Sequence, residues 1–251
     1  MPLDLTPVHM QFPGREIHWL ENTGSTMTVA AQLGAAGCPA GTVVVAEEQT
    51  AGQGRFGRIW HSERETGLYV SFVLRLSLAE ENLRVLAMTL GLAASEAIAR
   101  TADVECDLRW PNDVLIGDKK CAGILVAVEQ TTFVAGIGIN VNQTAFPAVL
   151  APIATSLRLA TGRPQSREAL LVHLIESADS FLRMLETGGK DPVLRMFTRA
   201  SSYVRGKHVF VEQEGAEIEG VTDGLDESGF LIVRRPDGTR VTIMAGGVRP
   251  K

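Results

Sequence analysis

Two apolar runs joined by a short turn constrain the fold of this chain more than any other feature. DLRWPNDVLI covers residues 107–116 and KCAGILVAVEQ covers residues 120–130, with Gly117, Asp118 and Lys119 around the connection. A turn of this length joins two strands as an antiparallel hairpin, because parallel strands need a crossover of a dozen or more residues. The sequence therefore predicts a sheet that contains antiparallel pairs.

Hydrophobic periodicity predicts the other elements. Further strands are expected at 15–22, 41–49, 67–76 and 131–143. The run at 67–76 alternates and predicts a half-buried strand. Helices are expected from the Ser25/Thr26 cap to near Gly37, and at 77–101, 166–188 and 191–200.

After Tyr203 the sequence changes to short strands separated by turn residues, at 207–213, 216–226, 229–235 and 239–247. About fifty residues of this kind are typical of a small SH3-like β-barrel. We therefore predict an α+β fold with two domains, 1–202 and 203–251.

Composition excludes several classes of function. The 251 residues carry a net charge of −5, so no overall positive field attracts nucleic acid. Three cysteines without a Cys-x-x-Cys pair favour a reducing compartment and argue against a disulfide framework or a zinc site. The amino terminus lacks signal-peptide features, and no run of eighteen apolar residues could span a bilayer. A cytoplasmic protein that binds neither DNA nor membrane is expected.

The loop AGQGRFGRIW, residues 51–60, has the composition of an anion-binding loop. Its glycines permit close approach to a ligand or movement of the loop, while Arg55 and Arg58 offer planar donors for carboxylate or phosphate. The alternative is a solvated loop with incidental arginines. A Walker A loop is excluded because Gly-Lys-Ser/Thr is missing, and a Rossmann turn is disfavoured because a strand follows instead of a helix.

Other polar residues lie beside or within apolar strands. Asn112 and Asp113 follow Pro111, which favours a turn or bulge with buried polar groups or an ordinary strand-end turn. Lys120 is either an edge residue in solvent or a cation facing a cleft. Asn140 and Asn142 share a face if the strand continues through them, as a structural network or as ligand contacts.

Cys121 lies in an apolar strand and has no histidine or acid near it in sequence. It is therefore interpreted as a core residue instead of a nucleophile.

The motifs GSTMT, AEEQTAGQGRFGRIWHS, RWPNDVLIGDKKCAGILVAVE and GIGINVN, in this order, resemble those of the biotin protein ligases. The resemblance extends from about Ser25 to Asn142, and the small β-domain is similar to that of the family. It implies a class II aminoacyl-tRNA-synthetase/biotin-ligase-like catalytic domain. It also implies that biotin and Mg-ATP form biotinyl-5′-AMP, from which a lysine of a carrier protein takes biotin.

The resemblance also implies roles for individual residues. It implies that the cations at the reacting centre are Lys120, Arg55 and Arg58. The implied biotin contacts are Ser25, Thr26, Met27, Gln49, Gln53, Gly54, Arg55 and Lys120. The implied adenylate contacts are Arg55, Arg58, Trp60, Asn112, Asp113 and Asn140, with Asp113 as a candidate Mg²⁺ ligand.

Three positions depart from the family pattern. Met27 stands where the family usually has asparagine, Gln53 replaces the first arginine of the loop, and Arg109 replaces a lysine. The first two remove a side-chain hydrogen bond and a cation from the expected site. Arg109 keeps the charge but changes its geometry.

The implied partner is the biotin carboxyl carrier protein of acetyl-CoA carboxylase or of another biotin-dependent carboxylase, with a homodimer as a further expectation. Twenty-four residues precede Ser25, fewer than the roughly sixty of a winged helix-turn-helix, so a DNA-binding repressor is not expected. Two alternatives stay open: a lipoate or octanoate ligase or transferase, and a non-catalytic protein that binds biotinyl adenylate.

Overall fold

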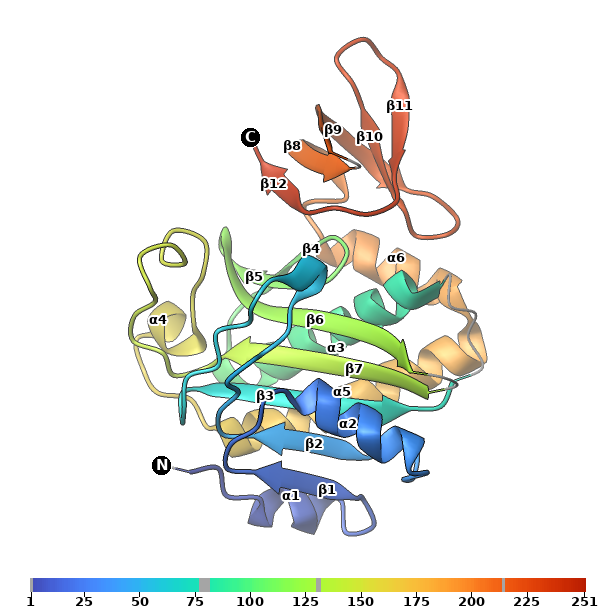
Figure 1. Ribbon diagram of the computed structural model, residues 1–251. Helices are drawn as coiled ribbons and strands as arrows, with labels where there is room; N and C mark the ends of the chain where they lie inside the picture. The colour runs from blue at the N-terminus through green and yellow to red at the C-terminus, as the bar shows by residue number, and fades with distance from the viewer. Residues whose placement is uncertain (1, 77–81, 130–131, 214) are drawn as a thin grey trace.

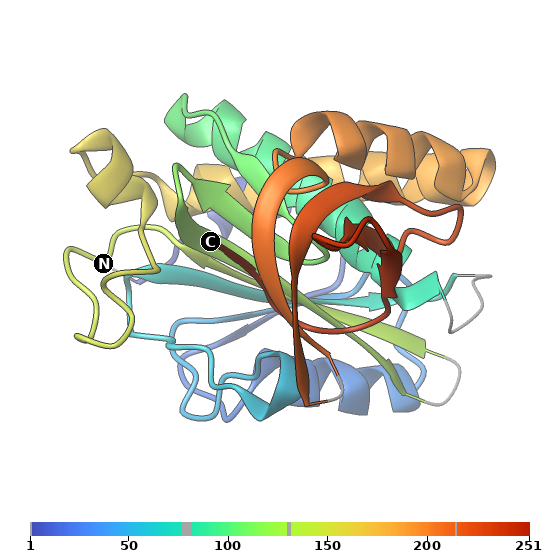
Figure 2. The same ribbon diagram turned by 90° about the horizontal axis from the view of Figure 1, so that it is seen from above.

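The computed structural model describes residues 2–76, 82–129, 132–213 and 215–251. The fold contains two sheets, a larger one low in Figure 1 and a smaller one above it. Figure 2 shows the whole molecule from above. The larger sheet has seven strands in the order β1-β2-β3-β7-β6-β5-β4. These strands are β1 (Ile17–Leu20), β2 (Val43–Ala46), β3 (Gly67–Leu74), β4 (Asp107–Arg109), β5 (Asp113–Ile116), β6 (Lys119–Glu129) and β7 (Thr132–Asn140).

The larger sheet is mixed, as its connections require. β1 and β2 are parallel, whereas every other neighbouring pair is antiparallel. The predicted hairpin is confirmed as β5–β6, and the segment 107–116 is itself folded into a second hairpin, β4–β5. The turn expected after Pro111 therefore separates two strands.

Helices cover both faces of this sheet. α2 (Thr26–Ala35) packs on one face against β2, β3 and β7, while α3 (Leu83–Ala102) and α5 (Arg167–Gly188) pack together on the other. β3 is consequently buried along its whole length, so the prediction of a half-buried strand was wrong. The expected start of α3 at 77–81 lies outside the described residues. The remaining helices are α1 (Thr6–Gln11), α4 (Leu157–Thr161) and α6 (Lys190–Ala200).

The segment Arg84–Ala102 of α3 is long and apolar enough to cross a bilayer by length and composition alone. It is, however, a core helix, because 72% of the relevant window is buried inside the protein. Its packing against α5 and β6 explains the continuous apolar sequence.

A buried ion pair ties α5 to the end of β2. Arg167 donates from Nη1 to Glu47 Oε2 at 3.0 Å and from Nη2 to Oε1 at 3.2 Å, and both side chains are at most 5% exposed. Such a bidentate contact fixes orientation as well as distance. It holds the strand end from which Gln49 follows.

The smaller sheet is antiparallel, with the strand order β11-β10-β9-β8-β12. Its strands are β8 (Arg205–Gln213), β9 (Ala216–Leu225), β10 (Leu231–Arg234), β11 (Arg240–Ile243) and β12 (Val248–Pro250). The first four confirm the predicted short strands, and β12 was not predicted. The domain boundary at 202/203 stays a prediction.

Candidate active site

Strand register places five side-chain positions in one row across the larger sheet. Tyr69 lies opposite Gly138, Gly138 opposite Gly123, Gly123 opposite Asp113, and Asp113 opposite Arg109. Directly opposite residues share a face of a sheet. The row therefore has polar side chains at its ends and two glycines in its middle, where the backbone is open to a ligand.

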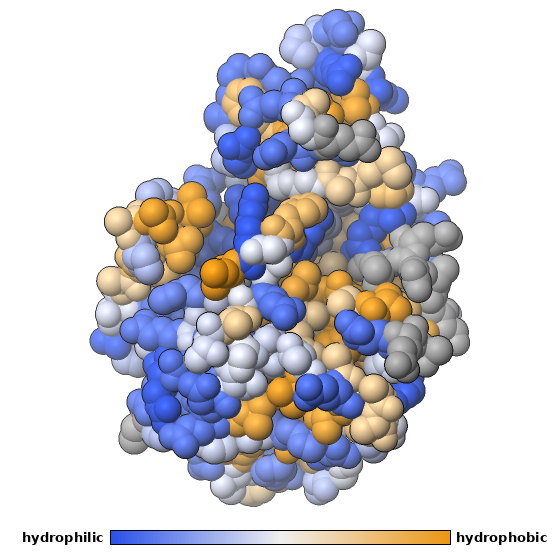
Figure 3. Space-filling view, in the orientation of Figure 1, coloured by the Kyte–Doolittle hydropathy of each residue, from blue (hydrophilic) through white to orange (hydrophobic). Residues whose placement is uncertain are grey.

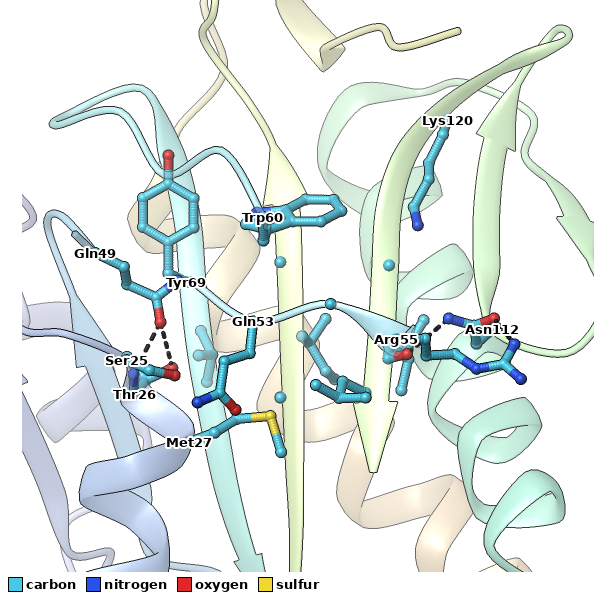
Figure 4. Close-up of a pocket in the computed structure, with 18 residues that line it drawn as sticks. Ser25, Thr26, Met27, Gln49, Gln53, Arg55, Trp60, Tyr69, Asn112 and Lys120 are labelled. Carbon is cyan, nitrogen blue, oxygen red and sulfur yellow. Dashed lines mark hydrogen bonds between the residues drawn. The ribbon is translucent and has the colours of Figure 1, made fainter. Parts of the chain in front are cut away.

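Trp60 lies on this glycine floor (Figure 4). A Cβ atom added at Gly138 would collide with the indole ring, and one at Gly123 would lie 3.0 Å from Trp60 Cζ3 and 2.8 Å from Lys120 Nζ. The indole Nε1 is buried and has no hydrogen-bond partner within the part of the chain that the structure describes. An unpaired buried donor beside a cavity is available to a ligand acceptor.

A small cavity of about 50 Å³ lies beside the floor, at the amino-terminal end of α2. A chain of hydrogen bonds lines it: Ser71 Oγ donates to Thr26 Oγ1 at 2.8 Å and Thr26 N donates to Gln49 Oε1 at 2.8 Å. Gln49 Nε2 donates onward to Ser62 Oγ at 2.8 Å. Ser25 Oγ is buried in the same wall without a partner among the described residues. The wall therefore offers a fixed polar network with one uncommitted hydroxyl.

Met27 and Gln53, two of the positions that depart from the family pattern, both line this first cavity and are seen close together in Figure 4. Met27 is 8% exposed and lies over β7, where a Cβ at Gly136 would come within 2.8 Å of its Sδ. The absence of a side chain at Gly136 therefore gives Met27 room against the backbone of β7. We call these two side chains the variable wall, because both depart from the family pattern; they line the cavity beside the hydrogen-bonded residues.

The glycine loop closes on itself. Gly54 N donates to Arg58 O at 2.7 Å, and Trp60 N donates to Gly52 O at 2.9 Å. The geometry of the loop requires glycine at two positions. A Cβ at Gly52 would lie 2.6 Å from Trp60 O, and Gly57 has φ +70°. Close packing and a left-handed turn thus both require glycine here.

Arg55 leaves this loop and reaches the WPND segment. Its Nη1 donates to Asn112 Oδ1 at 2.9 Å and contacts Gly246 O at 3.5 Å. Asn112 in turn donates from Nδ2 to Ile124 O at 2.9 Å, so both ends of its amide are used. Burial lowers the pKa of the Arg55 guanidinium, and the charge of Asp113 partly opposes that effect. Arginine nevertheless stays charged at neutral pH.

Asp113 joins two cations. Lys120 Nζ lies 2.5 Å from Asp113 Oδ1, and Arg109 Nη2 donates to Oδ2 at 2.7 Å. Burial alone would raise the pKa of Asp113, but the charges of Lys120 and Arg109 outweigh burial and lower it. Lys120 therefore faces the cleft, 5.3 Å from the Trp60 ring centre, and is not an edge residue in solvent.

The same contacts bear on the predicted magnesium site. Both oxygens of Asp113 are engaged by cationic side chains, and the described residues contain no group of three histidine, cysteine or acidic side chains that could hold a metal. Magnesium in phosphate-transfer sites prefers carboxylates in addition to substrate phosphates and water. The arrangement does not fit Asp113 as a direct metal ligand, so we derive no step through a resident metal.

A second, larger cavity of about 370 Å³ opens on the other side of Trp60, beneath the smaller sheet. In Figure 3, hydrophilic and hydrophobic side chains meet in this region. Arg58 and Asn140 line it, and Asn140 also donates from Nδ2 to Thr155 O at 3.0 Å. Arg55, Trp60, Asn112 and Lys120, together with Gly54, line both cavities and so form their common boundary.

The predicted site residues thus surround two adjoining cavities, although two neighbouring expectations differ. β7 ends at Asn140, so the condition under which Asn142 would share a face with Asn140 is not met, and the Asn142 side chain instead bonds the backbone of Gln165. Cys121 is fully buried, as expected of a core residue. Contact with Cys106 and burial raise the pKa of the Cys121 thiol well above its ordinary value.

Sequence reasoning missed several lining residues. In the first cavity these include Tyr69 and Gly123. The second cavity includes residues from two distant segments: Phe146, Leu150, Ile153 and Ala154, and Glu212, Gly246, Gly247, Val248 and Arg249. The first of these segments pairs with Lys120, whose backbone N donates to Ile153 O at 2.9 Å. A pattern such as GIGIN signals an open backbone, but no local pattern reveals contacts between distant segments.

Comparisons with known proteins agree with this arrangement. The model of the biotin/lipoate A/B protein ligase family matches residues 19–143, and that of the biotin protein ligase C-terminal domain matches residues 205–248. The biotin–[acetyl-CoA-carboxylase] ligase of Mycobacterium tuberculosis is 32% identical over 98% of this chain and 95% of its own length. The bifunctional ligase/repressor of Bacillus spizizenii is 31% identical over 90% of this chain and 72% of its own.

A solved structure is also similar. The biotin protein ligase from Aquifex aeolicus in complex with biotin and ATP has a TM-score of 0.84 and 31% identity, over 94% of this chain and 99% of that one. The similarity includes both sheets, since nearly the whole of each chain is covered. With the two adjoining cavities and the motifs on their walls, these comparisons show that the chain belongs to the biotin protein ligase family.

Proposed function

We propose that this protein is an ATP-dependent biotin protein ligase. It activates biotin as biotinyl-5′-AMP and transfers the biotinyl group to a lysine of a carrier protein. The observation that carries the proposal is the meeting of two cavities at a boundary that contains Arg55 and Lys120. A reaction that joins a carboxylate to a nucleotide needs two adjoining sites with cations between them.

In the first half-reaction, a carboxylate oxygen of biotin attacks the α-phosphorus of ATP. A carboxylate O–P bond forms, the bond from that phosphorus to the bridging oxygen breaks, and pyrophosphate leaves with the electron pair. Two anions approach one another, and negative charge accumulates on the phosphate oxygens. Fixed cations at that point stabilise the transition state more than the separate substrates.

We assign the two cavities accordingly. Ser25, Thr26 and Gln49 in the first cavity bind the polar ring of biotin, while Met27, Gln53 and Gly54 shape the rest of that cavity. Gln49 is oriented by Ser62, and the Ser25 hydroxyl is uncommitted. A preformed network of this kind lowers the cost of ordering the site around its ligand.

The second cavity is assigned to the nucleotide. Arg58 and Asn140 line the second cavity but not the first, whereas Trp60 lies on the boundary. Trp60 is therefore assigned contacts with both ligands. Asn112 and Asp113 act by holding Arg55 and Lys120 at fixed positions. Mg²⁺ enters this scheme with ATP, as part of the substrate.

In the second half-reaction, the amine of the carrier lysine attacks the acyl carbon of the mixed anhydride. A C–N bond forms, the acyl C–O bond breaks, AMP leaves with the electron pair of that bond, and the nitrogen releases one proton to solvent. The glycine loop and the smaller sheet both line the second cavity, so together they are placed to shield the mixed anhydride from water. Exclusion of water limits hydrolysis of the anhydride.

The carrier is expected to be the biotin carboxyl carrier protein of acetyl-CoA carboxylase, which the names of similar ligases support. Because the proposed reaction uses ATP and a carrier protein of this kind as substrates, we expect a cytoplasmic location. A homodimer stays a prediction.

A lipoate or octanoate ligase or transferase is the nearest alternative. Two observations disfavour it: the C-terminal segment matches a model specific to biotin protein ligases, and Cys121 is buried with a raised pKa, which is unsuited to an acyl-thioester nucleophile.

ATP–pyrophosphate exchange dependent on biotin tests the proposal. We expect exchange with biotin and none with lipoate or octanoate at the same concentration. Exchange with either of these acids but not with biotin would overturn it. Transfer of labelled biotin to a purified carrier domain tests the second half-reaction, and tight adenylate binding without transfer would favour a non-catalytic binding protein.

A further inference from the structure

A single turn of the smaller sheet is inserted against the helices and the WPND segment of the larger one. The turn connects β9 to β10 and consists of residues 226–230. Trp110 Nε1 donates to Gly229 O at 3.0 Å, and Arg84 Nε donates to Ser228 O at 2.7 Å. The Arg84 guanidinium also lies 3.5 Å from the centre of the Phe230 ring.

This turn has a defined shape. Asp226 Oδ1 accepts from Ser228 N at 2.9 Å and from Phe230 N at 2.8 Å, and Gly229 N donates to Asp226 O at 2.9 Å. Gly229 has φ +79°, and a Cβ added to it would lie 2.9 Å from Leu194 Cδ2 and from Met88 Cε. The backbone of the turn therefore lies directly against side chains of α3 and α6, and the positive φ together with this close contact favours glycine.

Trp110 connects this contact to the reacting centre. Its side chain is 2% exposed and it immediately precedes Pro111, Asn112 and Asp113. Asn112 accepts from Arg55, and Asp113 holds Lys120. The indole that the turn anchors is thus at most three residues from the two side chains that orient both boundary cations.

The smaller sheet also reaches the site by a second path. Gly246 O lies 3.5 Å from Arg55 Nη1, and Glu212, Val248 and Arg249 line the second cavity. The same sheet therefore forms part of the nucleotide cavity and anchors the segment below it. A shift of the turn would alter both sides of this cavity together.

We propose that the 226–230 turn is a positioning element for adenylation, which acts through Trp110 on Asn112 and Asp113 and keeps the smaller sheet over the nucleotide cavity. The inference rests on the proposed ligase function. It assigns to the turn an effect on ATP use and on the chemical step. Biotin binding is assigned mainly to Ser25, Thr26 and Gln49, which line the first cavity.

Gly229→Ala, compared with Gly238→Ala, tests the inference. Gly238 lies in the β10–β11 turn with φ +86°, and a Cβ there meets nothing within 4 Å. Both variants place alanine in a left-handed conformation, but only the Cβ of Gly229→Ala also meets side chains of α3 and α6. We expect Gly229→Ala to raise the KM for ATP, or lower kcat for exchange, by about tenfold or more relative to Gly238→Ala. Its Kd for biotin, from calorimetry, is expected to stay within about twofold.

Trp110→Phe gives a second, milder test. It keeps an aromatic ring but removes the N–H that Gly229 O accepts, and we expect a change of about three- to fivefold in the same ATP parameters. The inference is overturned if both variants match Gly238→Ala in KM and kcat, or if biotin binding weakens as much as ATP use. Absence of biotin-dependent exchange in the wild-type protein would instead overturn the proposed function.

Discussion

The two cavities of the active site are built in different ways. The first lies on the face of one sheet, where strand register, the start of α2 and a chain of hydroxyl and amide groups define its wall. The second is formed by the glycine loop, the segment 146–154 and the edge of the smaller sheet. A site built on strands is held more rigidly than one built from loops of separate segments.

The difference separates recognition from chemistry. The first cavity is suited to selecting a small polar ring, and the second to a flexible triphosphate. Arg55 and Lys120 lie on the common boundary of the cavities, where the proposed assignment of the two substrates puts the new bond. Substitutions at the boundary should affect kcat, whereas substitutions confined to one cavity should affect the KM of one substrate.

Lys120→Ala should have the largest effect, because it removes a boundary cation. We expect kcat for biotin-dependent exchange to fall by about 10²–10³-fold, as for loss of one transition-state donor in other enzymes. Lys119→Ala is the matched control, since Lys119 is exposed and donates to Ala151 O at the rim. Equal activities of the two variants would remove Lys120 from the boundary chemistry.

Asp113→Asn removes the negative charge that holds Lys120 and Arg109, so it should lower the stability of the fold by an amount that depends on pH. The pKa of Asp113 is lowered in the folded protein, so its ionised form stabilises the fold above about pH 4 and this contribution is lost as pH falls further. We expect the variant to be less stable by about 2 kcal/mol at pH 6, since the contacts are partly exposed. The difference should narrow below pH 4.

Urea unfolding at pH 6 and pH 3 measures this difference. Asp118→Asn, an exposed carboxylate in the β5–β6 turn, is the control. A stability difference between wild type and Asp113→Asn that stays constant with pH contradicts the assigned linkage.

Ser25→Ala changes the first cavity alone. Its hydroxyl is buried and has no partner among the described residues, so its loss should leave the fold intact and cost one hydrogen bond to biotin. We expect the KM for biotin to rise about tenfold, with the KM for ATP unchanged. A comparable rise in both constants would mean that the two cavities are not separable.

Arg58→Ala is the opposite test, in the second cavity alone. Arg58 is exposed and lines that cavity. We expect the KM for ATP to rise about fivefold and the KM for biotin to stay constant, because solvent screens an exposed cation. The pair Ser25→Ala and Arg58→Ala should therefore give reciprocal results in the same exchange assay.

Cys121→Ala should have the smallest effect on activity, although Cys121 adjoins Lys120 in sequence. The Cys121 side chain is fully buried and its Sγ contacts Val114 O at 3.5 Å, whereas the Lys120 side chain faces the cleft. We expect exchange within about twofold of wild type and a loss of stability of about 1 kcal/mol. Loss of exchange in a folded Cys121→Ala protein would revive the acyl-thioester alternative.

The sequence predicted single helices and strands better than the way in which they pack together. Helices with strong periodicity, such as α5 and α6, were found at nearly their observed bounds because local burial patterns determine them. Short elements such as α1, α4 and β12 were missed, since they are stabilised by tertiary packing instead of by local propensity. Full burial of β3 required knowledge that helices cover both sheet faces.

The site was predicted where a motif stays within one segment. Ser25 to Met27, the glycine loop and the WPND segment all reached the cavities. The pairing of Lys120 and Arg109 with Asp113 depends on strand register and on a register shift between β5 and β6. Likewise, the contact of Arg55 with Gly246 joins residues 191 positions apart. Contacts of this kind are products of the fold and leave no local signature.

The glycine floor also limits which positions can be changed to alter the substrate range of this enzyme. A side chain at 138 would strike the Trp60 ring, and one at 123 would crowd Trp60 and the end of the Lys120 side chain, so the floor offers little room for redesign. Space for a bulkier analogue has to come from the variable wall, at Met27 and Gln53, whose side chains occupy the first cavity without joining its hydrogen-bonded network. Libraries for the attachment of biotin analogues are therefore best restricted to these two positions.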